Sequence, residues 1–378
     1  MTPDNSYQSL QDLHKVCLSQ HIPFASYRLP QQSKISTLVQ YQALPQKIDT
    51  LQNLEGKKGF VIAPFIENEK NATYLLSPDF IFESNNIDAN SIQTLANTSL
   101  FLSAENDVRD QLIDTKKEDF IQQVENAKKT ILTGSLHKVV LSKVRLERLK
   151  DDFDATNFFH ELCNLYPHAM VYFIQLPHVG CWIGATPEPL MVIRDGKVQT
   201  VSLAGTQAAT QENRTDTRWS NKEIDEQGIV TSYIERTLQA LHIENYSLKG
   251  PTNYQAANLI HLKTSFEFSK TDLDNRLGEF INAMHPTPSV GGLPKDAALN
   301  FILTNEQHNR SYYSGILGPI NIANETHLFV NLRCMQLFKK HLVIYSGAGI
   351  TAASDAEKEW EETNHKMMTL LSVINKIR

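Results

Sequence analysis

The chain has 378 residues, of which 41% are hydrophobic, and a formal net charge of −6, so it can build one large core or two modest ones. Its acidic balance, without a block of Lys and Arg, argues against a nucleic-acid partner, because phosphate binding relies on clustered basic side chains. The four widely spaced cysteines form no CxxC motif, and no apolar run approaches the roughly 20 residues of a membrane span. With a polar N-terminus that lacks a signal-peptide core, these features predict a cytoplasmic protein without a zinc site, a disulfide framework or a membrane anchor.

The first 110 residues predict short apolar strands, for example over residues 59–66, between loops rich in Gln, Asn and Ser. They contain no reactive constellation, and we interpret them as scaffold. A helix is predicted over residues 115–134, where a capping pattern precedes an apolar face at helical spacing. A second helix is predicted over residues 154–166.

The rest of the chain alternates strands with single long helices. The helices are predicted over residues 221–241 and 355–377. The predicted strands, which include a hairpin turning at Asp195-Gly196, cover residues 137–145, 170–176, 181–185, 190–203, 315–322, 328–338 and 342–346. Because the connections are short and there is no strict βαβ alternation, the pattern predicts an α+β fold with antiparallel sheets.

Two pairs of glutamates on the predicted helices are the most informative feature of the chain. Glu223 and Glu226 lie three residues apart, as do Glu359 and Glu362, and residues at this spacing share one face of a helix. If the two helices meet, four carboxylates converge and need a cation between them. Hard oxygen ligands suit Mg²⁺, which takes one or two protein carboxylates and fills its other positions with waters and an anionic substrate.

A structural role explains the same glutamates. Ser220 precedes Glu223 by three residues and Ser354 precedes Glu357 likewise, which is the spacing of a capping box. Glu362 stands four residues before a lysine, as in a surface ion pair worth roughly 0.2 to 0.5 kcal/mol. On pattern alone, the structural interpretation is favoured for either pair taken singly.

Two further residues could supply acid and base chemistry. Lys138 interrupts an apolar strand; facing inward it would lose its hydration, which favours a neutral amine that can act as a base. On local sequence alone, an edge-strand lysine in water is the favoured interpretation. Glu188 follows a strand in a turn, where its carboxyl is either a general acid or a solvated loop residue.

Other candidates could bind an anion. Arg333 lies within a predicted apolar strand and must therefore meet a carboxylate, from a ligand or from the protein itself. Gly205 and Gly347 follow strands and would let a ligand approach the backbone, although a tight turn explains either glycine equally well. His261 is by default a hydrogen-bonded core histidine.

The ordered set of motifs resembles the chorismate-utilising enzymes, and among them most closely the isochorismate synthases. The resemblance covers about residues 115–375, is most specific over residues 285–366, and is only loose over residues 1–110. The motif positions are residues 138–142, 184–188 and 203–206, Glu226, residues 261–262 and 285–288, Arg310 with Tyr313, Arg333, and residues 347–349 and 359–366.

The resemblance implies one integrated α+β domain, with residues 1–110 as scaffold and residues 111–378 as the catalytic region, in which large antiparallel sheets form a sandwich flanked by helices. It also implies a Mg²⁺-dependent reaction in which water adds at C2 of chorismate while the C4 hydroxyl leaves. By motif match, Lys138 would activate the water and Glu188 would protonate the departing hydroxyl.

The resemblance also implies a ligand set. Glu226 and Glu362 would bind the metal, with Glu223 and Glu359 in support, and the metal would hold the ring carboxylate. Arg333, Tyr313 and the backbone of Gly347 would hold the enolpyruvyl carboxylate. The same pocket would be lined by Gly205, His261, Ser289 and Lys366.

Some positions separate relatives within the family. Ala204 replaces the covalent lysine of aminodeoxychorismate synthases, and Lys138 favours water over ammonia as nucleophile, so anthranilate synthase component I is a weaker alternative. Salicylate synthases share the lysine and both glutamates and remain a rival, as does a catalytically inactive chorismate-binding protein. Gln207, Gln227 and the Gly291-Gly292 and Gly318-Pro319 pairs depart from the family pattern. We expect a monomer that acts in menaquinone or siderophore synthesis.

Overall fold

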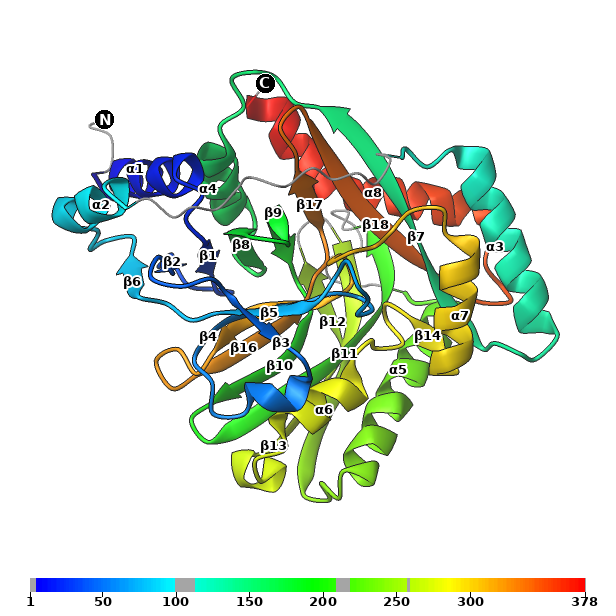
Figure 1. The fold of residues 1–378 in the computed structure, drawn as a ribbon. Helices are drawn as coiled ribbons and strands as arrows, with labels where there is room; N and C mark the ends of the chain where they lie inside the picture. Colours follow the sequence, from blue (N-terminus) through cyan, green and yellow to red (C-terminus); the bar gives the residue numbers. More distant parts are fainter. Residues whose placement is uncertain (1–4, 99–112, 209–217, 257–258, 378) are drawn as a thin grey trace.

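The structure is a computed structural model that describes residues 5–98, 113–208, 218–256 and 259–377. Its strands form two nine-stranded sheets in which every pairing is antiparallel (Figure 1). In the part of the chain that is described, no helix is both long enough and apolar enough to cross a bilayer.

The first sheet has the strand order β14-β7-β18-β17-β9-β8-β1-β2-β6. These strands are β14 (Gly292–Leu293), β7 (Lys138–Arg148), β18 (His341–Ile350), β17 (Cys334–Leu337), β9 (Gly180–Thr186), β8 (Met170–Leu176), β1 (Phe24–Arg28), β2 (Ser36–Val39) and β6 (Phe80–Glu83).

The second sheet has the order β12-β13-β11-β10-β16-β15-β4-β5-β3. Its strands are β12 (Tyr246–Ala256), β13 (Leu259–Ser269), β11 (Lys197–Ala208), β10 (Pro189–Arg194), β16 (Thr326–Val330), β15 (Ile316–Ile320), β4 (Gly59–Ala63), β5 (Thr73–Leu76) and β3 (Gln46–Ile48).

Apolar side chains fill the space between the sheets and the space under the helices. Tyr172 and Trp182 of the first sheet pack with Phe60 and Phe329 of the second, so the two sheets share one core. Helices cover the outer faces (Figure 1). They are α1 (Asn5–Ser19), α2 (Ala89–Ala96), α3 (Lys117–Leu132), α4 (Ala155–Leu165), α5 (Asn221–Ala240), α6 (Leu277–Met284), α7 (Lys295–Asn305) and α8 (Ala356–Ile377).

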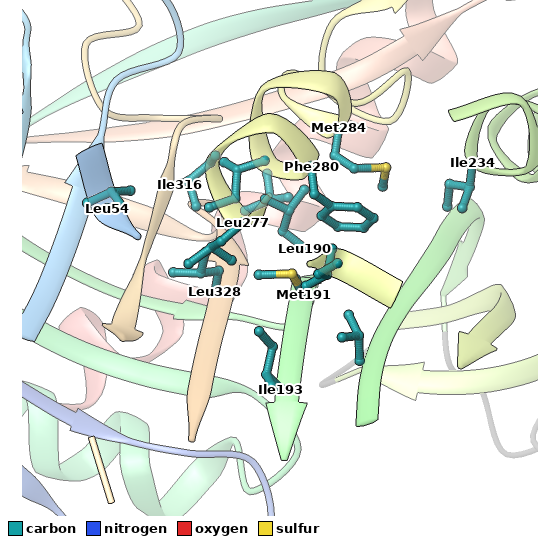
Figure 2. Packing of buried hydrophobic residues seen from close by; sticks show 14 of the residues in the cluster. Leu54, Leu190, Met191, Ile193, Ile234, Leu277, Phe280, Met284, Ile316 and Leu328 are labelled. Atoms are coloured by element: carbon teal, nitrogen blue, oxygen red, sulfur yellow. The ribbon is translucent and has the colours of Figure 1, made fainter. Parts of the chain in front are cut away.

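The helix α6 shows how an outer layer is held. Figure 2 shows Leu277, Phe280 and Met284, which recur at helical spacing, turned toward Leu190 and Met191 of β10. All five side chains are buried. Burying such a side chain contributes about 1.5 to 3 kcal/mol relative to leaving it in water, so the apolar stripe fixes α6 against the second sheet.

The long periodic elements were predicted correctly. The helices α3, α4, α5 and α8 and the strands β7, β8, β9 and β18 lie where the patterns place them. The hairpin of β10 and β11 turns at Asp195 and Gly196, whose φ angles of 52° and 72° are those of a two-residue turn with both central residues left-handed. The α+β prediction is therefore confirmed by the architecture.

Three predictions about elements were wrong or incomplete. The single strand predicted over residues 328–338 is broken into β16 and β17, which belong to different sheets. The scaffold of the first 110 residues includes α1 and α2 as well as strands. The helices α6 and α7 and the long hairpin of β12 and β13 were not predicted, because their patterns are short or mixed.

Candidate active site

The predicted base, Lys138, opens β7 and is fully buried. Its Nζ lies 2.7 Å from Oε1 of Glu226 on α5, so the inward-facing alternative is the one that the structure adopts. Gly349 of the neighbouring strand β18 makes room for this pair. A Cβ at Gly349 would lie 2.5 Å from the Glu226 carboxylate and 3.1 Å from Cε of Lys138, so both side chains would have to shift to admit it.

The predicted acid, Glu188, lies in the connection from β9 to β10 and is 6% exposed. Burial raises its pKa to about 7, against the lowering effects of a hydrogen bond from Ser289 and of the charges of Lys138, Arg333 and Lys366. Desolvation disfavours the charged carboxylate. A carboxyl that is half protonated near neutral pH can donate a proton, so the general-acid alternative has its physical basis.

Glu188 and Arg333 meet because two connections run side by side. The chain leaves the first sheet for the second between β9 and β10, and it returns between β16 and β17. Backbone hydrogen bonds join the crossings, from Val330 N to Glu188 O at 2.9 Å and from Ala185 N to Arg333 O at 3.0 Å. Residues 142 or more positions apart in the sequence thus share one small region.

Arg333 is not part of a strand, contrary to the prediction. It has a left-handed φ of 48° at the crossing from β16 to β17, where the backbone leaves one sheet for the other. Burial lowers the pKa of its guanidinium, which is opposed by the phenol of Tyr313 and the carboxylates of Glu362 and Glu188. Among the described residues, no carboxylate lies within ion-pair distance of this guanidinium; it lines a cavity of about 260 Å³.

The crossing that carries Arg333 is held by Asn331, which sequence reasoning missed. Asn331 is fully buried, accepts a hydrogen bond from the Tyr172 hydroxyl at 2.5 Å and donates one to the Tyr312 carbonyl at 2.8 Å. An asparagine in the middle of an apolar run, two positions before Arg333, was the available signal of a break in the strand.

Lys366 and Glu362 face β18 from α8. The predicted i to i+4 pair is formed, with Lys366 Nζ 2.6 Å from Glu362 Oε1, and the lysine side chain is only 12% exposed. Lys366 also donates to the Gly347 carbonyl at 3.0 Å. A Cβ at Gly347 would lie 2.9 Å from the Tyr313 hydroxyl, so this glycine lets Tyr313 approach the strand.

His261 and Gly205 lie on neighbouring strands of the second sheet. His261 Nδ1 is hydrogen-bonded to the Gly205 carbonyl at 3.1 Å, as expected for a buried histidine. Burial, and then the charges of Arg333 and Lys366, lower its pKa to about 3, so the ring is neutral near pH 7. The same charges place it beside the other candidate residues.

A family model described as chorismate binding enzyme matches residues 2–375. The chain belongs to the chorismate-binding enzyme family. The resemblance that the motifs predicted is therefore confirmed, and it extends through residues 1–110, where the motifs matched only loosely.

The similar proteins in this family are named for two different activities, isochorismate synthase and anthranilate synthase. The vibriobactin-specific isochorismate synthase of Vibrio cholerae is 26% identical over 63% of this chain and 62% of its own length. The isochorismate synthase EntC of Escherichia coli K12 is 28% identical over 67% of this chain and 66% of its own length. Anthranilate synthase component 1 of Aquifex aeolicus is 26% identical over 88% of this chain and 68% of its own length. The chain thus matches less than two thirds of the length of each of the two isochorismate synthases.

Solved structures of chorismate-binding enzymes share the fold. The menaquinone-specific isochorismate synthase MenF of Escherichia coli has a TM-score of 0.73 at 20% identity, covering 93% of this chain and 88% of its own. Anthranilate synthase component I of Streptococcus pneumoniae has a TM-score of 0.66 at 19% identity, and the match covers 92% of this chain and 89% of its own. At these identities the likeness concerns the fold alone.

The four predicted metal-binding glutamates do not gather into one cluster. Among the described residues, no three His, Cys, Asp or Glu side chains lie close enough together to hold a metal ion. Glu223 accepts from the backbone N of Ser220 at 2.9 Å in a capping box, which is its structural alternative. Glu359 is 1% exposed in the first turn of α8, where Asp355, rather than the expected Ser354, accepts from the Lys358 amide at 3.0 Å.

Glu226 and Glu362 nevertheless have the chemistry that Mg²⁺ needs. Both are carboxylates, one on α5 and one on α8, and they are paired with the ammonium groups of Lys138 and Lys366 at 2.7 and 2.6 Å. Magnesium commonly takes only one or two protein carboxylates and keeps waters and substrate oxygens in its other positions. A two-carboxylate ligand set therefore fits this region, and it stays a prediction.

Proposed function

We propose that the protein is an isochorismate synthase that converts chorismate to isochorismate. The observation that carries the proposal is the buried Glu188, whose pKa is raised to about 7 by burial and which is surrounded by Lys138, Arg333 and Lys366. A protonated carboxyl and a buried amine whose charge acts on it can supply an acid and a base to opposite ends of a small substrate.

In the proposed reaction, Lys138 accepts a proton from a water molecule whose oxygen forms a bond to C2 of chorismate. The ring double bonds shift, the bond from C4 to its hydroxyl breaks, and Glu188 donates the proton with which this group leaves as water. One water enters and one leaves, so the product is an isomer of the substrate. Lys138 acts as a base only when Glu226 turns its carboxylate to another partner.

The anionic groups of chorismate need fixed positive charge. Arg333 is suited to the enolpyruvyl carboxylate because its planar guanidinium offers two parallel N–H donors. The Tyr313 hydroxyl and the backbone at Gly347 are close enough to each other to share that role. Neutral His261 and Ser289 add polar contacts without adding charge.

We propose Mg²⁺ as the cofactor, held by Glu226 and Glu362. When bound, such an ion neutralises a substrate carboxylate and acts as a Lewis acid. Isothermal titration of the Glu362→Ala variant with MgCl₂ should show weaker binding than the wild type, with activity lost in parallel. Glu223→Ala is the matched control, because Glu223 serves the helix cap; unchanged titration of Glu362→Ala would remove Glu362 from the ligand set.

The test of the proposed function is a product assay with chorismate and Mg²⁺. Formation of isochorismate without pyruvate supports the proposal, while salicylate together with pyruvate makes the protein a salicylate synthase. Anthranilate formed when ammonium is supplied points to an anthranilate synthase component. Binding of chorismate without any product identifies an inactive binding protein and overturns the proposal.

We also propose a monomeric, cytoplasmic protein in menaquinone or siderophore synthesis. Light scattering tests the monomer, and cell fractionation tests the compartment. Deletion of the gene tests the pathway, since the growth defect should be corrected by supplying either menaquinone or a siderophore.

A further inference from the structure

The edge of β7 that carries Lys138 is completed by side chains. The strand β14 pairs with β7 over two residues only, with Gly292 opposite Val139 and Leu293 opposite Lys138. Beyond that, the Val140 amide still donates to the Gly291 carbonyl at 2.8 Å, but the Val140 carbonyl accepts from Nη2 of Arg310 at 2.6 Å and the Ser142 amide donates to Oε1 of Glu306 at 2.6 Å. The Arg310–Glu306 pair therefore takes the place of a further length of strand.

This pair is rigid and almost completely buried. Arg310 donates from Nε to Oε2 of Glu306 at 2.8 Å and from Nη2 to Oε1 at 2.5 Å, and the side chains are 3% and 2% exposed. Burial by itself would raise the pKa of Glu306, but the charge and hydrogen bonds of Arg310 hold it below its ordinary value. The guanidinium also lies over the Phe65 ring, 4.3 Å from its centre.

The other terminal nitrogen of the guanidinium, Nη1, bonds to the loop that precedes β14, next to the hydrogen-bond partner of Glu188. Nη1 of Arg310 donates to the Val290 carbonyl at 2.8 Å. Val290 follows Ser289, whose side chain is hydrogen-bonded to Glu188. One guanidinium thus connects the strand that begins at Lys138 with the loop that holds the hydrogen-bond partner of Glu188.

We propose that Arg310, held by Glu306, is a positioning residue that fixes the separation between Lys138 and Glu188. The inference rests on the proposed function for the roles of those two residues. Arg310 bonds backbone carbonyls on both sides and acts through them. A lysine cannot replace it, because a single ammonium cannot serve two divergent carbonyls and both oxygens of a carboxylate at once.

The first test compares Arg310→Lys with the wild type in steady-state kinetics on chorismate. We expect kcat to fall about 10- to 100-fold while KM changes less than about threefold, since misplacement of about 1 Å can cost that much in rate. Arg145→Lys is the matched control, because Arg145 pairs with Glu147 at the exposed end of the same strand; its kinetics should equal the wild type. Glu306→Gln should give a smaller loss, about 3- to 10-fold, in the same direction.

A second readout separates positioning from a general loss of folding and does not depend on the proposed function. The protonation midpoint of the Glu188 carboxyl, followed by ¹³C NMR in substrate-free protein, should rise in Arg310→Lys, because the Ser289 bond that lowers it is displaced. The other charged groups around Glu188, which are Lys138, Arg333 and Lys366, are unchanged in this variant. Near-ultraviolet circular dichroism measures the folded fraction.

The outcomes are distinct. Wild-type kcat per folded molecule and an unshifted Glu188 midpoint in both variants overturn the inference. If Arg310→Lys does not fold, Glu306→Gln decides by the same two measurements. If wild-type protein does not convert chorismate, the proposed function fails, and the midpoint still decides whether Arg310 positions the two residues.

Discussion

At the residue scale, Lys138 is paired with the carboxylate of Glu226. Its side chain is fully buried and its Nζ contacts Glu226 at 2.7 Å, so removing either partner leaves a charged group in a poorly solvated place. The same burial keeps bulk water from the amine. A lysine held in this way serves catalysis only if its neighbours change on substrate binding.

Lys138→Met should therefore lower kcat at least about 100-fold, because general base catalysis contributes 10²- to 10⁴-fold to the rate. Chorismate affinity should stay within about threefold, since Arg333, rather than Lys138, is the proposed anchor of the substrate. Steady-state assays and calorimetric titration check both values. Lys143→Met is the control, because Lys143 lies on the same strand but its ammonium contacts Asn364 and Trp360; substantial activity in Lys138→Met would refute the proposed base.

Glu188 should make both the free energy of unfolding and the turnover depend on pH. Its pKa is raised by burial to about 7 from an ordinary 4.5, so between these values the folded chain holds a proton that the unfolded chain has released. Stability from this group is present at low pH and is lost as pH rises toward 7. Turnover that needs the protonated acid should fall over the same range.

Glu188→Gln should remove both effects. Relative to the wild type, its free energy of unfolding should increase by about 2 to 3 kcal/mol between pH 4.5 and pH 8, while its kcat drops at least about 100-fold. Urea denaturation at several pH values measures the first effect. Parallel pH dependence in the two proteins would show that Glu188 keeps an ordinary pKa.

At the element scale, β18 is the surface on which the two acidic helices converge. Gly349 contacts Glu226 of α5, and the carbonyl of Gly347 accepts from Lys366 of α8. Both helices therefore place a residue of the predicted set beside this strand, whereas the predicted cluster of four carboxylates is not found among the described residues. The hydrophobic period of the sequence identified the helices and the strand. It could not show that side chains from other elements pack closely against Gly347 and Gly349 of this strand.

Gly349→Ala should fold but lose at least about tenfold in kcat, because its methyl group displaces the pair of Glu226 with Lys138. Gly228→Ala on α5 is the contrasting variant. A Cβ at Gly228 meets nothing within 4 Å, so alanine should stabilise the helix by about 1 kcal/mol and leave kcat unchanged. Thermal unfolding and chorismate turnover test both; full activity of Gly349→Ala would show that the pair is not needed.

The broken strand marks the limit of local patterns. Apolar residues continue from β16 through Leu332 into β17 with little interruption, so period alone predicts one strand. The break arises because Asn331 bonds to Tyr172 and Tyr312 from other elements. Those partners are distant in sequence, and no window of residues contains them.

At the scale of the whole molecule, the N-terminal part of the chain up to residue 98 contributes strands to both sheets. They supply β1, β2 and β6 to the first sheet and β3, β4 and β5 to the second. β1 pairs with β8, and β4 pairs with β15. An integrated domain, rather than a detachable N-terminal part, is therefore the prediction.

A chain that starts at residue 113 should not fold, because it lacks three strands of each sheet and exposes the edges of β8 and β15. The full chain should unfold in one cooperative transition. Near-ultraviolet circular dichroism and urea denaturation test both statements. A truncated chain with a native spectrum would show that residues 113–378 form an independent unit.

The sequence by itself determined the fold class, the long helices and most strands that follow residue 113, because hydrophobic period is a local property. It also determined the candidate residues through motif resemblance. The tertiary structure decided which of them meet: Lys138 with Glu226, Glu188 beside Arg333, and Glu223 in a helix cap. These pairings depend on two crossings between sheets and on close backbone approach at glycines, and both are set by packing between segments that are far apart in the chain.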